Sequence, residues 1–328
     1  MASDPLVTHI YTADPSAHVF EGKIYVYPSH DRETDIQFND NGDQYDMADY
    51  HVLSLSEFNG PVTDHGVVLK ADDVPWVSKQ LWAPDAATKN GRYYLYFPAR
   101  DKEGIFRIGV AESDRPSGPF KPDPSPIPGS YSIDPASFVD DDDDGGRVYL
   151  YFGGIWGGQL QCWKDNDTFD PSMSGPQEPK GSDVPALSCR VARLSDDMHG
   201  FAEPVRQVQV VDENGAPLVA DDHDRRFFEA PWMHKYKGKY YFSYSTGDTH
   251  YLVYAIGDNP YGPFTYAGRI LEPVVGWTTH HSIVEYKGRW YLFYHDCELS
   301  NGVDHLRSVR MREIVYDDQG RISLAQKQ

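Results

Sequence analysis

Short runs of apolar and aromatic residues recur along the chain, each following a turn in which Gly precedes Lys or Arg. Five segments have this form: 20–29, 89–98, 144–153, 236–245 and 286–295. Gly at the second turn position supplies the positive backbone dihedral that a two-residue hairpin turn requires. The runs are β-branched or aromatic and too short for an amphipathic helix. The pattern therefore predicts five antiparallel hairpins.

A second recurrence follows the hairpins, in which a strand and a polar turn lead to an outer strand near Gly-Pro. It is found at 51–62, 108–120, 189–201 and 252–264, and the last unit closes with 306–322. Four strands per unit, repeated around an axis, are typical of a propeller. We predict an all-β fold, a five-bladed β-propeller. The turn glycines are 69, 55, 92 and 50 residues apart, longer than the usual repeat of about 40–50 residues, so the excess is expected in loops.

A polar, ionisable residue stands upstream of each predicted hairpin turn. These residues are Asp14, Asp85, Asp134, Glu229 and the pair His280/His281. In a propeller, each unit would present one of them to a shared centre, which predicts an active site in an axial pocket. Carboxyl groups brought close together acquire different pKa values and suit acid/base work. Glycoside hydrolysis needs such a pair, with one carboxyl group protonated and one ionised.

Composition supports one large β domain and excludes some partners. The chain has 328 residues, 14% aromatic residues and a formal net charge of −20. No linker-like shift in composition divides it, so we expect one catalytic domain over 1–328. The negative charge makes a nucleic-acid partner improbable. No apolar run of about 18 residues predicts a membrane span. The opening lacks a leader pattern, so we expect a cytoplasmic protein, or a secreted one if a leader has been removed.

Six ordered motifs resemble glycoside hydrolase family 43 over essentially the whole chain. They are THIYTADPSAHVF, WAPDAATKNGRYYLYF, YSIDPASFVDDD, FFEAPWMHKYKGKYYFSYS, THHSIVEYKGRWYLFYHD and DHLRSVRMREIVYDDQGRI. The resemblance implies a five-bladed propeller that hydrolyses glycosides of xylose and arabinose with inversion. It is closest to single-domain β-xylosidase/α-L-arabinofuranosidase members. The expected partner is a xylo- or arabino-oligosaccharide.

The resemblance also assigns roles to three carboxyl groups. It makes Asp14 the general base, Asp134 the residue that tunes the pKa and orients, and Glu229 the general acid. Ala230 stands where the family often has Gly after the acid. Taken singly, each carboxylate is typical of a turn or strand-end cap. The order of the three along the chain favours a catalytic role instead. For Asp85 the family gives no catalytic step, so a structural hydrogen-bonding role is expected.

The resemblance suggests further residues for the sugar and for a metal ion. Arg307 would contact the sugar, or alternatively pair with an edge carboxylate. Trp82 would stack on the sugar ring, or pack in the core. Adjacent strand residues face opposite ways, so only one of His280 and His281 can face the axis. His280, with His281 as the alternative, would bind an axial calcium ion. Calcium prefers oxygen ligands, so this site would be weak. No cofactor is required for the chemistry.

Two long polar segments, 31–49 and 165–185, are expected to rise around the mouth of the axial site. Such walls would form a pocket that admits a chain end, which predicts an exo-acting enzyme releasing terminal xylose or arabinofuranose. Two alternatives remain. One is a non-catalytic carbohydrate-binding propeller, which need not keep all three carboxylates. The other is an endo-arabinanase or endo-xylanase on the same scaffold.

Overall fold

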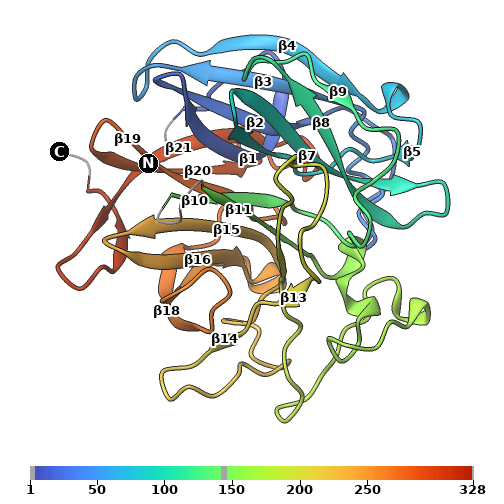
Figure 1. Cartoon of the computed structure of the whole chain (residues 1–328), viewed down its shortest axis with the longest axis vertical. Coiled ribbons are helices and arrows are strands. Elements are labelled where there is room, and N and C mark those ends of the chain that lie inside the picture. Colours follow the sequence, from blue (N-terminus) through green and yellow to red (C-terminus); the bar gives the residue numbers. More distant parts are fainter. Residues whose placement is uncertain (1–3, 142–145, 327–328) are drawn as a thin grey trace.

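The computed structural model describes residues 4–141 and 146–326. Five mostly antiparallel sheets, each a blade, are arranged around a common centre, so the predicted five-bladed propeller is confirmed (Figure 1). Each blade is built by consecutive strands. Among the described residues, no helix is long and apolar enough to cross a membrane.

The blades follow one another in chain order. Blade 1 contains β1 (Tyr11–Phe20), β2 (Lys23–Asp31), β3 (Asp49–Leu55) and β4 (Thr63–Lys70). Blade 2 contains β6 (Asp85–Lys89), β7 (Arg92–Asp101), β8 (Phe106–Ser113) and β9 (Lys121–Pro122), with β5 (Val77–Lys79) also pairing with β7. Blade 3 contains β10 (Ala136–Asp140), β11 (Arg147–Phe152), β12 (Arg190–Arg193) and β13 (Arg206–Gln207).

The last two blades have the same order. Blade 4 contains β15 (Glu229–Tyr236), β16 (Lys239–Ser245), β17 (Leu252–Gly257) and β18 (Phe264–Leu271). Blade 5 contains β19 (His281–Tyr286), β20 (Arg289–Asp296), β21 (Ser308–Tyr316) and β22 (Ile322–Leu324). The two-residue strand β14 (Val210–Val211) pairs in parallel with β18 at the outer edge of blade 4.

Four of the predicted hairpin turns have the expected backbone. In each, both central residues have positive φ, as a two-residue turn of the mirror-image type requires. The pairs are Glu21-Gly22, Asn90-Gly91, Lys237-Gly238 and Lys287-Gly288. The turn predicted in blade 3 includes residues 142–145, which lie outside the described residues.

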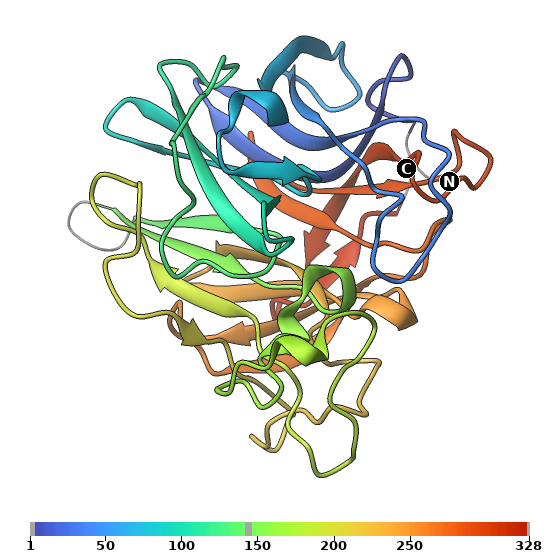
Figure 2. The same ribbon diagram turned by 90° about the vertical axis from the view of Figure 1, so that its right-hand side faces the viewer.

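The longer repeats are explained by connections, as the glycine spacing predicted. The largest lies between β11 and β12 and contains the short 3₁₀ helices η2 (Trp156–Gly158), η3 (Leu160–Cys162) and η4 (Pro171–Met173). It projects from the ring together with neighbouring loops, as Figure 2 shows in green. Of two others, η1 (Ala71–Asp73) connects blade 1 to β5 of blade 2, and η5 (Gly247–Thr249) lies between β16 and β17 of blade 4.

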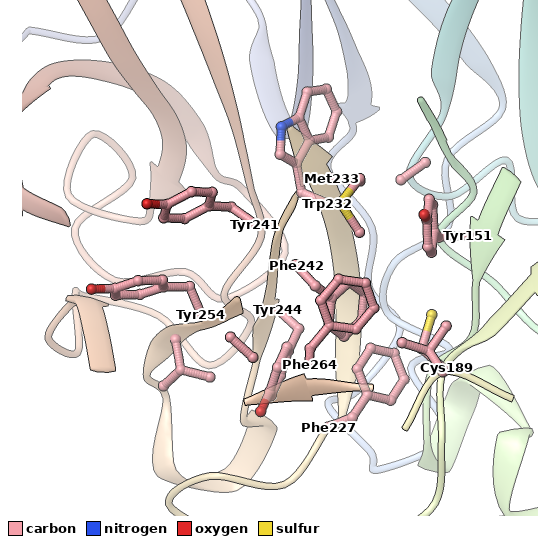
Figure 3. Packing of buried hydrophobic residues seen from close by; sticks show 14 of the residues in the cluster. Tyr151, Cys189, Phe227, Trp232, Met233, Tyr241, Phe242, Tyr244, Tyr254 and Phe264 are labelled. Carbon is pink, nitrogen blue, oxygen red and sulfur yellow. The ribbon is translucent and has the colours of Figure 1, made fainter. Parts of the chain in front are cut away.

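The core lies between neighbouring blades, because each sheet is apolar on both faces. Between blades 3 and 4, Tyr151 and Cys189 face Phe242 and Phe227 (Figure 3). Tyr241 and Tyr254 lie on the other face of blade 4, and Tyr241 approaches blade 5 at Tyr316, with ring centroids 5.7 Å apart. Aromatic pairs of this kind add specific packing to the hydrophobic effect.

The ring closes where blade 5 meets blade 1, which lie side by side in Figure 1. The backbone N–H of Leu6 donates to the carbonyl of Val309 at 2.8 Å, and that of Thr12 donates to the carbonyl of Arg307 at 2.9 Å. Leu53 and Phe293 belong to one apolar cluster across this boundary. Among the described strands, none from one end of the chain is inserted into the blade of the other end.

Candidate active site

A pocket lies at the centre of the ring and receives residues from every blade. Its empty volume, open mouth included, is about 630 Å³, which is the size of a small-ligand site. Asp14, Trp82, Asp134, Glu229 and His280 line it, one from each blade or the segment leading into it, and Arg307 lines it as well. Five of the six are the predicted catalytic and substrate-binding residues, and the sixth is the favoured metal ligand.

The three carboxyl groups are held by an unusual backbone. Asp14, Asp134 and Ala230 have φ of 49°, 56° and 57°, and each is followed by proline. A left-handed conformation is costly for residues other than Gly, and proline restricts the preceding residue further. Strain of this kind is found where the surrounding structure imposes a position. It also explains why Gly suits the position of Ala230.

Asp14 is an ionised carboxylate with three hydrogen-bonded partners around it. Its Oδ1 accepts from Arg307 Nη1 at 2.9 Å, and its Oδ2 accepts from Ser29 Oγ at 2.6 Å. Its backbone N–H donates to Nδ1 of His295 at 3.0 Å. Burial alone would raise the pKa of Asp14, but Arg307, the two nearby histidines and the Ser29 hydrogen bond lower it to about 2. A base must be unprotonated to accept a proton, and Asp14 meets this condition.

Arg307 connects Asp14 to a second buried carboxylate, Asp31. Its Nε and Nη2 donate to the two oxygens of Asp31, both at 2.8 Å, and its Nη1 also donates to Thr278 Oγ1 at 3.1 Å. The guanidinium lies over the ring of Tyr45, 4.8 Å from its centroid. Such a bidentate pair fixes orientation as well as charge. Arg307 therefore does pair with carboxylates, but with the buried Asp14 and Asp31 rather than with the edge carboxylate expected as its alternative role. Contact with a sugar remains a prediction.

Asp134 and Glu229 are coupled acids. Burial raises the pKa of Asp134 well above its ordinary value, and the charges of Glu229 and Asp14 raise it further. Burial also raises the pKa of Glu229 to about 8, with a further contribution from Asp14. Asp134 Oδ2 accepts the backbone N–H of Ala230 at 2.9 Å, which ties it to the residue after Glu229. Two such carboxyl groups share protons as a pair, so this side of the pocket holds a proton at neutral pH.

The two adjacent histidines point in opposite directions, as strand geometry predicts. His280 lines the pocket, with Nδ1 3.7 Å from Asp14 Oδ1 and 3.8 Å from Asp134 Oδ2. Burial lowers its pKa to about 4, so it is neutral. His281 instead contacts Ser243 Oγ through Nε2 at 2.6 Å and is not part of the pocket.

The donor set at the centre fits a calcium ion only as a mostly hydrated one. Calcium takes six to eight oxygen ligands, whereas His280 offers a single nitrogen. The carboxylate oxygens closest to it already accept hydrogen bonds from Arg307 and Ala230. His280 would be the protein ligand, and water would supply the other ligands. Such an ion would add positive charge beside Asp14 and Asp134.

Asp85 departs from the pattern of inward-facing residues. It is fully buried, accepts a hydrogen bond from the backbone N–H of Ser137 and contacts His18 Nε2 at 2.6 Å. It does not line the axial pocket. The expectation that every blade presents its upstream polar residue to the centre is therefore wrong for blade 2, and the structural hydrogen-bonding role expected for Asp85 is confirmed.

Trp82 is both a wall of the pocket and a core residue. Its indole N–H donates to the carbonyl of Tyr45 at 2.8 Å, and its ring packs 4.6 Å from that of Phe106. A Cβ on Gly42 would lie 2.7 Å from the ring, so the backbone approaches it closely. The core-packing alternative is therefore realised, and stacking on a sugar remains a prediction.

One of the two predicted walls is present and the other is not. Residues of the segment 31–49 line the mouth, including Phe38 and Tyr45. Residues 165–185 do not line the pocket, so that expectation is wrong. The earlier part of the same connection, 155–158, supplies the wall instead. In the later part, Glu178 accepts a hydrogen bond from Arg226 Nη2 at 3.2 Å.

Sequence reasoning missed several residues that shape the site. In the sequence, Asp31 marks only the start of a polar segment, and His295 only ends an aromatic run. Both belong to a His-Asp dipeptide at the end of the second strand of a blade, at 30–31 and 295–296. The repeated dipeptide is the signal in the sequence that could have identified both residues.

An aromatic group at the mouth was also missed, formed by Trp277, Phe228 and Trp156. These residues lie in loops, and their sequence positions carry no such signal.

Comparisons with known proteins agree with this geometry. The model of the glycosyl hydrolases family 43 matches residues 7–322. The chain is 75% identical to xylosidase/arabinosidase 43A of Humicola insolens over 97% of this chain and 98% of the other. It is 57% identical to a beta-xylosidase of Xylanibacter ruminicola, covering 95% and 96% of the two chains.

A solved structure is similar over the same extent. It is a beta-xylosidase/alpha-arabinofuranosidase from a compost microbial metagenome, in complex with xylotriose in a calcium-free form. It has a TM-score of 0.95 and 61% identity, and the match covers 98% of each chain. With a family match over nearly the whole chain and a propeller that gathers the family's motif residues in one pocket, the chain belongs to glycoside hydrolase family 43.

Proposed function

We propose that this protein is an exo-acting, inverting glycoside hydrolase that releases terminal xylose and arabinofuranose from xylan- or arabinan-derived oligosaccharides. Relatives named xylosidase/arabinosidase or beta-xylosidase, at 57–75% identity, support the substrate class. The pocket supports exo action, because the segment 31–49 and residues 155–158 wall it. A walled pocket receives the end of a chain better than its middle.

One observation carries the proposal: the pocket separates its carboxyl groups into an ionised and a protonated set. The pKa of Asp14 is lowered to about 2, and that of Glu229 is raised to about 8. Between these values Asp14 can accept a proton while Glu229 can donate one, which is the division of labour of a glycosidase. A non-catalytic sugar-binding propeller has no need of this separation.

The proposed roles follow from this division. Asp14 deprotonates a water that attacks the anomeric carbon, and Glu229 donates its proton to the departing glycosidic oxygen. Asp134 shares protons with Glu229 as a pair and positions the backbone after it through Ala230. Arg307 keeps Asp14 ionised and fixed in place. Inversion further requires Asp14 and Glu229 to be roughly 6.5–9.5 Å apart, which leaves room for the water.

The test is hydrolysis of xylobiose followed by proton NMR. The xylose released from the non-reducing end should first appear in the α configuration, opposite to that of the β-linked substrate, before it equilibrates. Glu229→Gln should be inactive, and Glu272→Gln, an exposed carboxylate in the same blade, should behave as wild type. A β-configured first product would contradict inversion, and equal activity of Glu229→Gln would remove the proposed acid.

Product analysis on xylan and arabinan separates exo from endo action. The proposal expects monosaccharide from the earliest time points, with slow loss of viscosity. Internal cleavage would give mixed oligosaccharides and a rapid fall in viscosity, and would favour the endo-acting alternative. Side-by-side assays on nitrophenyl β-xyloside and α-arabinofuranoside measure the preference between the two sugars.

A further inference from the structure

A second group of ionisable side chains lies on blade 1, outside the axial pocket. It consists of His30, Asp49 and His51, whose candidate ligand atoms all lie within 4.8 Å of one another. None of the three lines the pocket, and none is used in the proposed reaction. We propose that these residues form a binding site for a divalent transition-metal ion, with zinc as the best match.

Strand pairing brings the three side chains together. Ser29 of β2 pairs with Tyr50 of β3 in an antiparallel ladder, which places the next residues, His30 and Asp49, opposite each other. His51 follows Asp49 by two positions on β3, so the two side chains project from the same face. The site is therefore built on a rigid sheet, although its residues are up to 21 positions apart in the sequence.

The donor set and its spacing suit zinc. His30 Nδ1 lies 2.6 Å from Asp49 Oδ1, and His51 Nε2 lies 4.0 Å from the same oxygen. The two imidazole rings are 4.5 Å apart. Ligands of a tetrahedral zinc ion are separated by about 3.3 Å, given metal–ligand bonds of about 2.0–2.1 Å. Small rotations of these side chains would reach that spacing, and two imidazoles with one carboxylate are ordinary zinc ligands.

His51 is already oriented as a metal ligand would be. Its Nδ1 lies 2.9 Å from Asp64 Oδ1, so a proton on Nδ1 leaves the lone pair of Nε2 directed toward Asp49. Asp64 is in turn held by the backbone N–H of Gly66 at 2.8 Å and by His9 Nε2 at 2.8 Å. A carboxylate behind a ligating histidine is the usual outer partner in zinc sites.

Access and charge also permit an ion to bind. The side chains of His30, Asp49 and His51 are 21%, 25% and 11% exposed, so water can reach the site and supply a fourth ligand. Lys70 pairs with Asp49 across the strands and places one positive charge nearby. The carboxylates of Asp49 and Asp64 offset it. The site does not depend on the proposed glycosidase activity.

The location gives such an ion a structural consequence. His30 and Asp49 stand at the two ends of the connection 32–48, which carries Phe38 and Tyr45 of the pocket wall. An ion bound to both residues would fix the two ends of this connection relative to each other. It would also steady the end of β2, where Asp31 holds Arg307.

The test is titration of chelator-treated protein with zinc chloride by isothermal titration calorimetry. The wild type should bind one equivalent that is lost in His30→Gln and in His51→Gln. His65→Gln is the control, because His65 is a histidine of the neighbouring strand that contacts Ser54 and is outside the group, although it is more exposed. It should retain the equivalent. Any zinc held at His280 would persist in all these variants and is thereby distinguished.

Two further measurements test the role of Asp64 and the geometry of the bound ion. Asp64→Asn should bind zinc about 10–100-fold more weakly, the usual effect of removing an outer carboxylate. Cobalt(II) added in place of zinc should give the visible absorption of a tetrahedral ion in the wild type and in His65→Gln, but not in His30→Gln or His51→Gln. Circular dichroism verifies that each variant is folded. Wild-type protein that binds no zinc, or folded His30→Gln and His51→Gln that bind as wild type does, would overturn the proposal.

Discussion

Nη1 of Arg307 donates a 2.9 Å hydrogen bond to Oδ1 of Asp14 across the boundary between the last blade and the first. The same guanidinium holds both oxygens of the buried Asp31. Asp14 is therefore ionised because Arg307 lies beside it, and Arg307 is in turn held in place by Asp31. The proposed base is defined by this three-residue arrangement as much as by its own position.

Replacing Arg307 by Lys should raise the pKa of Asp14, because Lys cannot hold two carboxylates with a planar fork. The acidic limb of log(kcat/KM) against pH should then move to higher pH, and the optimum value should fall about 100-fold through misplacement. Ser29→Ala removes only the hydrogen bond to Oδ2 and should shift the limb in the same direction by less. Unchanged profiles in both folded variants would show that these donors do not control the base.

Replacing Glu229 by Gln should affect substrates according to their leaving groups. Loss of a general acid costs about 10²–10⁴-fold when the departing oxygen needs a proton. Xylobiose should therefore lose activity by about this factor, whereas dinitrophenyl xyloside, whose leaving group departs as a stable anion, should lose much less. Steady-state kinetics on both substrates measures the difference. Equal losses would assign Glu229 a role other than proton donation.

Replacing Asp134 by Asn should move the alkaline limb of the pH profile. In the wild type, kcat/KM should fall above about pH 8, where Glu229 loses its proton. Once the pair has lost one proton, the resulting charge opposes loss of the second, and Asn removes this repulsion, so the fall should begin at lower pH. The Asn oxygen can still accept the N–H of Ala230. An alkaline limb that stays in place, with near-normal activity, would make Asp134 only a structural cap.

Glu229→Gln should also change stability in a pH-dependent way. A carboxyl group whose pKa is raised on folding, here from an ordinary value near 4.3 to about 8, makes the folded state less stable as pH rises through this window. The variant lacks this penalty, so its free energy of unfolding should exceed that of the wild type at pH 7 by up to about 3 kcal/mol. The two should converge near pH 4. Thermal unfolding at both pH values measures this, and a difference independent of pH would contradict the raised pKa.

The blades could be predicted because their signals are local. Asn90-Gly91 and its counterparts dictate hairpin turns whatever their surroundings, and the aromatic runs after them dictate strands. The positions of Asp14, Asp134 and Glu229 in the pocket could be predicted because motif order and blade order coincide. Their roles were taken from a family resemblance, and the three φ values before proline give those motifs a physical reason.

The remaining features depend on contacts between residues distant in the sequence. Asp31 and Arg307 are 276 residues apart, and only closure of the ring shows that one holds the other. Asp85 has the sequence context of an inward-facing residue, yet His18 and Ser137 satisfy its carboxylate away from the pocket. The segment 165–185 has the composition of a wall, but composition does not give the direction in which a loop projects. The pairing of β14 with β18 likewise involves only two residues on each strand.

Ring closure has a consequence for how the protein would lose activity. Blades 1 and 5 meet through side chains and a few backbone hydrogen bonds, such as those of Leu6 and Thr12, rather than through a shared sheet. Local opening at such a boundary leaves the sheets themselves paired. It would nevertheless separate Asp14 from Arg307, and the proposed base would lose the charge that keeps it ionised. Activity is therefore expected to decline under mild denaturing conditions before the β-sheet signal in circular dichroism does.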